Sequence, residues 1–572
     1  NDIAGLDRRW QRNRRFRERE AELSLLAAEA QPQQRVELRM ALATFYLANG
    51  YAAEAKGTLD YIVREDSKTP LSSRFYLLRA LSELMLHRPA QAANDLMHSE
   101  VKDTQDAALL RAIAFAEMGD WSGARENYRA GLAGLKLLPV DLQRGVLFSA
   151  LRSAIEVRDF QEAGRLIADI ETVEVPDDYA KQFALLSGRF AEGLGRIDRA
   201  FALYDLAQRG DTDMYTAEAA FRQIELRFTR GEFNRAKAID RLESLAFNWR
   251  GDRVELEANR LLARLYVGEA RYREAFRLLD HALLAQNNSP VTRTFHNEMA
   301  LVFEDLFLSD KADALPPIEA LALYYDFSKL TPVGRRGDEM IRRLSDKLVA
   351  VDLLDQASEL LQHQVEFRLT GAARAQVAAR LAIVHLLNRK PQKAVAILAA
   401  TRLADLPHDL REGRLLLESR ALMDTNRFDQ ALDIISGLKG PEADRQRADI
   451  YWGAKRWRKA GEAIEAMLAA RTENEAPLQD YEKNDILRAA LAHALSGETI
   501  GLDRLREKYA GALEGPAKES FEQLTTNPGP RSIAGAAKVL ASVDTLGLFL
   551  KLYQAKYPSA PLPQRNEQLS AR

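Results

Sequence analysis

Apolar side chains recur along this chain at spacings of three and four, which is the pattern of amphipathic helices. In residues 268–284 the stripe consists of Tyr272, Ala275, Phe276, Leu279, Ala282 and Leu283. A second stripe over residues 261–266 precedes it, and Gly268 separates the two. Because a glycine ends a helix more readily than it continues one, the segment predicts two helices joined by a tight turn.

This helix–turn–helix unit repeats through most of the chain. An alanine follows each predicted turn, at Ala55, Ala92, Ala124, Ala163, Ala200, Ala236, Ala275, Ala357, Ala394, Ala431 and Ala460. Twelve residues earlier the residue is small in nine of the eleven units: Ala43, Ala80, Ala112, Gly188, Ala263, Ser345, Ala382, Ser419 and Ala448; Leu151 and Ile224 are the exceptions. Small residues on both helices allow close antiparallel packing, and steps of 29 to 39 residues, with one of 82, are typical of two-helix repeats.

The spacing resembles tetratricopeptide (TPR) repeats. The best match has Ala263, Tyr266, Ala275 and Ala282 where TPR units place their small and aromatic residues. The resemblance covers residues 36–475, with steps longer than the usual 34 residues and few closing prolines. It implies an all-α, right-handed α-solenoid that binds proteins on the concave face built by the first helices, with irregular, bacterial-type repeats.

The pattern also predicts how the chain is divided. We expect an Arg-rich N-terminal helix at 1–35, a TPR-like array at 36–308, a degenerate repeat or break at 309–337, a second array at 338–475, a helical cap at 476–557 and a disordered tail at 558–572. The cap would cover the last apolar face of the array, as repeat proteins require. Its last helix is predicted over residues 534–557.

Partner-binding candidates come from register and from the break. Arg260 and Arg264 face the groove of the predicted array, and Arg342 and Arg343 are their counterparts beyond the break. An alternative is that these arginines are solvated surface charge. The Lys and Asn pattern with which TPR domains clamp a terminal carboxylate is not reproduced.

Aromatic and basic side chains add two further candidate surfaces. Tyr324 and Tyr325 lie beside the break, where they either line a groove or belong to the core between repeats. At the N-terminus the basic stripe consists of Arg8, Arg12, Arg15 and Arg19. This stripe fits an acidic partner, but Glu18, Glu20 and Glu22 follow at once, so a solvated helix end with Arg–Glu pairs is the alternative.

Composition narrows the class of partner. Formal net charge is −2, from 81 basic and 83 acidic residues, which argues against binding nucleic acid with the body of the protein. No apolar run approaches the length of a membrane span, so membrane contact is expected only through the Arg-rich helix or whatever preceded Asn1 in a processed or truncated chain. The chain has no cysteine. This favours an oxidising compartment such as a bacterial periplasm, with the cytoplasm as the alternative.

The sequence offers little evidence for a catalytic or cofactor-binding site. The eight histidines form no metal-binding motif, no phosphate-binding loop occurs, and we expect neither cofactor, metal nor small-molecule substrate. His385 takes a position held by Tyr or Phe in other units and is expected in the core. Glu519 and Ser520 resemble the Glu–Ser pair of lytic transglycosylases, in which Glu519 would be the general acid, but the residues that follow depart from that pattern.

The sequence therefore predicts a non-catalytic scaffold for protein–protein interaction, in a bacterial cell-envelope assembly such as a motor, pilus or exporter. One alternative is a cytoplasmic TPR adaptor or co-chaperone that binds an extended peptide. A lytic-transglycosylase-like cell-wall enzyme is the third hypothesis.

Overall fold

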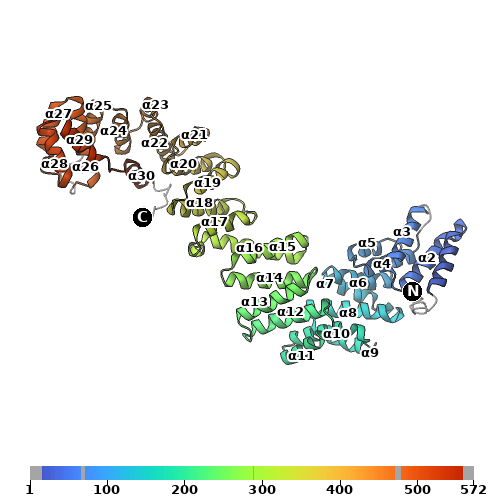
Figure 1. Ribbon diagram of the computed structural model, residues 1–572. Helices are drawn as coiled ribbons and strands as arrows, with labels where there is room; N and C mark the ends of the chain where they lie inside the picture. Colours follow the sequence, from blue (N-terminus) through green and yellow to red (C-terminus); the bar gives the residue numbers. More distant parts are fainter. Residues whose placement is uncertain (1–15, 66–70, 174, 288, 470–477, 558–572) are drawn as a thin grey trace. The chain divides into compact units, whose positions relative to one another are not determined.

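The computed structural model describes residues 16–65, 71–173, 175–287, 289–469 and 478–557, and this part of the chain is all-α (Figure 1). The first fifteen helices are α1 Phe16–Ala28, α2 Pro32–Ala48, α3 Ala52–Glu65, α4 Ser73–Met85, α5 Pro89–Leu96, α6 Gln105–Glu117, α7 Trp121–Gly131, α8 Val140–Glu156, α9 Phe160–Thr172, α10 Asp177–Gly193, α11 Ile197–Ala207, α12 Met214–Thr229, α13 Arg235–Asn248, α14 Arg253–Gly268 and α15 Tyr272–Ala285. The others are α16 Pro290–Leu308, α17 Pro317–Asp326, α18 Arg335–Ala350, α19 Leu354–His363, α20 Gly371–Leu387, α21 Pro391–Ala400, α22 His408–Asp424, α23 Phe428–Ile434, α24 Pro441–Gly453, α25 Trp457–Ala469, α26 Asp480–Ser496, α27 Thr499–Tyr509, α28 Gly515–Thr526, α29 Pro530–Leu540 and α30 Thr545–Lys556. Short helical turns are η2 Leu132–Leu137, η3 Asp310–Ala314, η4 Ser328–Leu330 and η5 Gln364–Arg368.

The helices form two compact units, Asn1–Arg293 and Thr294–Arg572, divided within the first turn of α16. From α2 to α27 the even-numbered helices are the first members of helix pairs, here called A helices, and the odd-numbered ones are the second members, called B helices. Within each unit, A helices pack on their B partners and on the next A helix, as α10 does on α11 and α12. The predicted break at 309–337 contains η3, α17 and η4.

Most turns inside a pair have three residues, and the second one adopts a left-handed conformation. In the turn between α14 and α15 this residue is Ala270, with φ 57°, and the N–H of Arg271 donates to the carbonyl of Tyr266 at 2.9 Å. The same conformation occurs at His87, Arg158, Asp352, Arg389, Asn426 and Lys455, and at Gly119 and Gly195. A repeated turn geometry thus joins the helices even where no glycine is available.

The predicted small positions are buried where helices of a pair cross. Ala263 and Ala275 are fully buried, and the hydroxyl of Ser419 donates to the carbonyl of Ala431 at 2.9 Å. At Gly188 a Cβ would lie 2.7 Å from the ring of Tyr204. The alternation of small and large residues therefore sets the approach of each helix pair.

The predicted register is wrong in one unit. Ala236 is exposed, and Ala238 is the fully buried alanine of α13. The turn between α12 and α13 spans residues 230–234, two more than the usual three, so the buried position moves by two residues.

The cap predicted after residue 475 contains α26 to α30, but its last helix is broken. The single helix expected over 534–557 is divided into α29 and α30, because Asp544 caps a new helix by accepting from the N–H of Gly547 at 2.9 Å. No single helix in the described ranges is long and apolar enough to cross a membrane; α29 and α30, bent by 52°, meet the length and composition test only together.

Candidate functional site

The two predicted groove arginines of the first unit lie on one A helix. Arg260 is half-buried and Arg264 is exposed on α14. They share this A-helix surface with Arg253, which donates to Glu257 at 2.8 Å and lies 3.9 Å from Glu156 of α8. Both arginines therefore lie on an A helix, and that they face a binding groove stays a prediction.

Arg342 and Arg343 lie on α18, and both pair with Glu339 of the same helix. The Nε of Arg342 donates to Glu339 at 2.7 Å, and Arg342 is 3.5 Å from Asp346. Arg343 is exposed and donates to the carbonyl of Leu308 at the end of α16. These two arginines therefore share Glu339, and their other partners, Asp346 and the carbonyl of Leu308, differ.

The two tyrosines beside the break have different roles. Tyr324 is buried, and its ring lies 6.1 Å from Phe303 and 5.7 Å from Phe307, so it belongs to the core between α16 and α17. Tyr325 is 43% exposed and is the tyrosine of this pair that is available at the surface.

Most of the predicted N-terminal basic stripe lies outside the described residues, namely Arg8, Arg12 and Arg15. Arg19 lies on α1, is exposed, and pairs with Glu22 at 2.6 Å. Its partner is one of the acidic residues that favoured the alternative of a solvated helix end.

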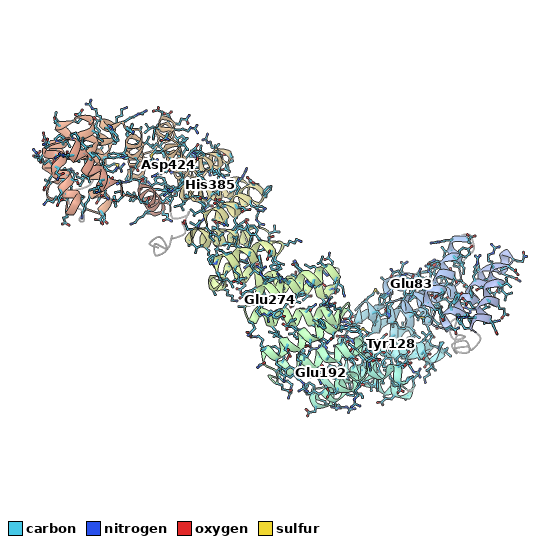
Figure 2. The ribbon with its side chains drawn as sticks, in the orientation of Figure 1. Glu83, Tyr128, Glu192, Glu274, His385 and Asp424 are labelled. Carbon is cyan, nitrogen blue, oxygen red and sulfur yellow. The ribbon has the colours of Figure 1, made fainter. Side chains whose placement is uncertain are left out.

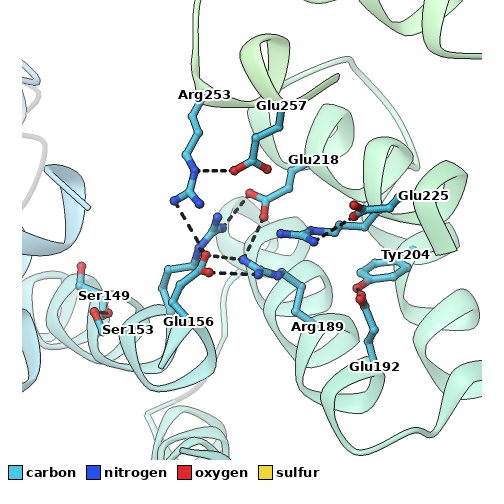
Figure 3. A network of polar contacts seen from close by, with 12 residues as sticks. Ser149, Ser153, Glu156, Arg189, Glu192, Tyr204, Glu218, Glu225, Arg253 and Glu257 are labelled. Atoms are coloured by element: carbon cyan, nitrogen blue, oxygen red, sulfur yellow. Dashed lines mark hydrogen bonds and ion pairs between the residues drawn. The ribbon is translucent and has the colours of Figure 1, made fainter. Parts of the chain in front are cut away.

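A network of buried charge crosses the A helices of the first unit (Figure 3). Arg189 of α10 lies between Glu156 of α8 and Glu218 of α12, at 2.6 and 3.2 Å. Arg152 of α8 also reaches both carboxylates, at 3.0 Å from Glu156 and 2.7 Å from Glu218. Since Arg189 is 9% exposed and Glu218 is 5% exposed, the pairs are largely shielded from water.

The guanidinium groups keep this network ionised. Burial alone would raise the pKa of Glu156, but the hydrogen bond from Arg189 and the charges of Arg189 and Arg152 outweigh it and lower the pKa to about 2. Burial is opposed in the same way at Glu218, whose pKa is also lowered. Glu156 and Glu218 thus each pair with arginines of neighbouring A helices, and these ion pairs link α8, α10 and α12.

A second row of charge lies on the A helices of the other unit. Arg380 of α20 donates to Asp346 of α18, and Arg445 of α24 lies 2.6 Å from Asp485 of α26. Burial raises the pKa of Asp346 despite the nearby charge of Arg380. Figure 2 labels Asp424 of α22 in this row; it accepts from Arg420 at 3.1 Å.

The C-terminal helix α30 covers part of this row. Arg420 of α22, 4% exposed, donates to the carbonyl of Thr545 at 3.2 Å, and its guanidinium lies 5.5 Å from the ring centre of Phe549. At the other end of α30, Lys556 lies 2.9 Å from Glu442 of α24. The helix is therefore held at both ends by A helices of its own unit.

The centre of α30 fits against a glycine. A Cβ at Gly413 of α22 would lie 2.8 Å from the hydroxyl of Tyr553, so a larger residue at this position would displace the tyrosine. Tyr553 is 3% exposed, and burial raises its pKa. We call the residues beneath α30, Gly413, Arg420 and Glu442, the α30 surface.

Sequence reasoning missed both the network and the α30 surface. A signal was present: a charged residue directly follows the small position in several units, at Arg152, Arg189, Glu225, Arg264, Asp346, Arg420 and Asp449. Charge that recurs at one register position indicates a row across successive A helices. Only Arg264 of this set was selected from the sequence.

The residues considered for chemistry are placed as follows. His385 is 4% exposed in α20, which confirms the expected core position (Figure 2). Glu519 is exposed on α28, whereas Ser520 is buried. In the part of the chain that the structure describes, no group of three or more His, Asp or Glu side chains is arranged to hold a metal ion.

Paired helices, small crossing positions and stacked A helices define a TPR-like helical repeat protein, and such repeats generally bind proteins. No family model matches the chain, and no curated protein matches it.

Solved structures with a similar fold share little sequence. The TPR domain of P58(IPK) has 14% identity and TM-score 0.25, covering 83% of this chain and 99% of its own. The APC/C hetero-tetramer Cut9–Hcn1 has 10% identity and TM-score 0.26, with 94% and 98% covered. The human IFIT1 dimer with PPP-AAAA has 15% identity and TM-score 0.34, with 70% and 94% covered.

Proposed function

We propose that this protein is a non-catalytic scaffold that binds a helical segment of a partner protein on the A-helix face of its second unit. The observation that carries the proposal is α30, a largely apolar helix that lies on α22 and α24 and buries Phe549, Leu550 and Tyr553. A surface that holds one such helix has the shape and the polar groups to hold another.

The contacts of α30 on this surface favour a helical partner over an extended peptide. Arg420 donates to the carbonyl of Thr545 in the first turn of α30, while Phe549 lies next to its guanidinium. An extended peptide would present its side chains alternately to two faces and could not repeat the spacing of α30. The cytoplasmic adaptor that grips an extended peptide therefore remains the second candidate.

The proposal is tested by selecting helical peptides from a random library against the full chain. We expect enriched sequences with apolar residues at helical spacing, whose affinity falls at least about tenfold with Gly413→Tyr, which fills the α30 surface. A matched control is Gly57→Tyr on α3, where a Cβ meets nothing within 4 Å. Binders that ignore the change at Gly413 would contradict the proposal.

The proposed setting is a bacterial cell-envelope assembly, with the protein in the periplasm. The absence of cysteine supports it. Fractionation of the native cell tests the compartment: recovery in the cytosol would overturn the periplasmic setting and favour the adaptor alternative.

A further inference from the structure

One segment of the chain already occupies the proposed binding surface, and it has the properties of a ligand. The buried residues of α30 are Phe549, Leu550 and Tyr553, and the half-buried Leu546 before them and the buried Tyr557 just after the helix extend the spacing to i, i+3, i+4, i+7 and i+11. Helices that bind in the grooves of other proteins present anchors at this spacing.

The polar contacts at the two ends give α30 a direction. Its first turn accepts from Arg420, and its last turn places Lys556 opposite Glu442. Glu442 lies at the start of α24, next to Gly440. A helix bound in the reverse direction would lose the Lys–Glu pair, so the surface selects a basic C-terminal end.

The connection to the rest of the cap allows α30 to leave. Residues 541–544 join it to α29, which is fixed in the cap by the fully buried Ala536. The bend of 52° lies at this connection. Departure of α30 would thus change the backbone only at a short segment between two helices.

The surface beneath α30 also tolerates exposure. Arg420 keeps its partner Asp424 on the same helix, at 3.1 Å, when α30 is absent. Glu442 is already partly exposed. Arg420 therefore stays paired after α30 leaves, whereas Glu442 loses Lys556 and is left to pair with the basic end of another helix.

We infer that α30 is a resident competitor: the partner segment is a helix with the same anchor spacing and a basic C-terminal end, and it binds only when α30 leaves the α30 surface. This inference rests on the proposed function. It predicts that affinity for a helix added in trans is set by the fraction of molecules in which α30 has left.

The test uses the full chain and a dye-labelled peptide with the sequence of residues 545–557. Because the chain has no cysteine, Glu442→Cys with Lys556→Cys provides a unique pair that a short bismaleimide can link, locking α30 in place. Phe549→Ala with Tyr553→Ala loosens α30 without changing the surface. The matched control is Lys551→Ala, on the exposed side of α30.

We expect the loosened chain to bind the peptide at least about tenfold more tightly than the wild type, and the locked chain at least about tenfold more weakly. Lys551→Ala should match the wild type. In the loosened chain, Glu442→Lys should weaken binding about threefold and a peptide with Lys556→Glu should restore it.

Each failure has a separate meaning. If the loosened chain is folded by circular dichroism and does not bind the peptide, the α30 surface is not a helix-binding site and the proposed function fails. If the wild type binds as tightly as the loosened chain while the locked chain does not, the proposed function stands and the competitor role is overturned. Dimers that form by exchange of α30 between copies would also overturn it.

Discussion

In the first unit Arg189 lies between two carboxylates of neighbouring A helices, whereas in the second unit Arg420 lies beneath a helix returned from the C-terminal cap. Both arginines follow the small residue of their A helix, at Gly188 and Ser419. At the same register position, the A-helix face of the first unit is covered by paired side chains of the repeats. The A-helix face of the second unit is covered by α30.

The ratio of arginines to carboxylates explains how charge is buried on each face. Glu156 is approached by Arg152, Arg189 and Arg253, and its pKa falls to about 2. Asp346 pairs with Arg380 and Arg342 but also feels Glu339, and burial raises its pKa. Several guanidinium groups are needed before attraction exceeds the loss of hydration.

The largest expected effect comes from removing Arg189. Arg189→Ala leaves Glu156 and Glu218 buried with fewer partners, so we expect the first unit to lose about 3–5 kcal/mol in unfolding free energy, measured by denaturant titration. Arg165→Ala is the control, since Arg165 is 67% exposed and 3.8 Å from Glu162, and should change stability by less than about 1 kcal/mol. Equal losses would show that the network is not what closes this face.

Acid should weaken the second unit before the first. Burial, together with the charges of Lys393 and Lys390, lowers the pKa of His385 to about 4. The unfolded chain therefore binds this proton first, and the stabilisation, present above about pH 6.5, falls by about 3 kcal/mol as pH drops to about 4. The corresponding loss from Glu156 falls between about pH 4.5 and 2.

His385→Phe isolates this contribution, because the position equivalent to His385 in the unit of α14 is the aromatic Tyr266. The unfolding free energy of the wild type, measured relative to that of the variant, should fall between about pH 6.5 and 4 and should stay constant from about pH 7.5 to 6.5. A difference that stays constant over this range would contradict the assignment.

Gly413→Ala tests the cover of the second face. The added Cβ meets the hydroxyl of Tyr553, so we expect α30 to lose about 1–3 kcal/mol of protection in hydrogen exchange while α22 keeps its own. Gly535→Ala in α29 is the matched change at a site with nothing within 4 Å, where helix propensity alone should raise stability. If α30 is equally protected from exchange in both variants, Gly413 does not determine how α30 covers the second unit.

The smallest expected effect concerns the turns shared by both units. Arg158 has φ 61°, which a residue with a Cβ adopts at a cost, so Arg158→Gly should raise the unfolding free energy, measured by denaturant titration, by up to about 1 kcal/mol. Asn426→Gly should gain less, since asparagine tolerates this conformation. If both variants gain the same unfolding free energy, the backbone strain at Arg158 is not what limits the stability of these turns.

The helix pairs could be predicted because Ala263, Ala275 and their equivalents obey a local packing rule that acts within a single unit. Ala236 escaped the rule because turn length, which no side-chain pattern encodes, moved the buried position to Ala238. The confirmed position of His385 came from the same register.

The candidate site was less accessible to sequence reasoning. The row of charge joins residues far apart in the sequence: Arg189 and Glu218 are 29 positions apart, and Arg152 and Glu218 are 66 apart. The α30 contacts join residues more than a hundred positions apart, such as Lys556 with Glu442. Abundant arginine suggested solvated charge, and only the stacking of successive A helices reveals which arginines are buried.

The pair between Arg152 and Glu218 has a mechanical consequence. In an array whose repeats contact only their neighbours, damage spreads across one interface at a time, and stretching peels repeats from an end. This pair skips the intervening helix α10, and Arg253 of α14 reaches back to Glu156 of α8. The segment from α8 to α14 should therefore resist tension as one stiff block and yield in a single step.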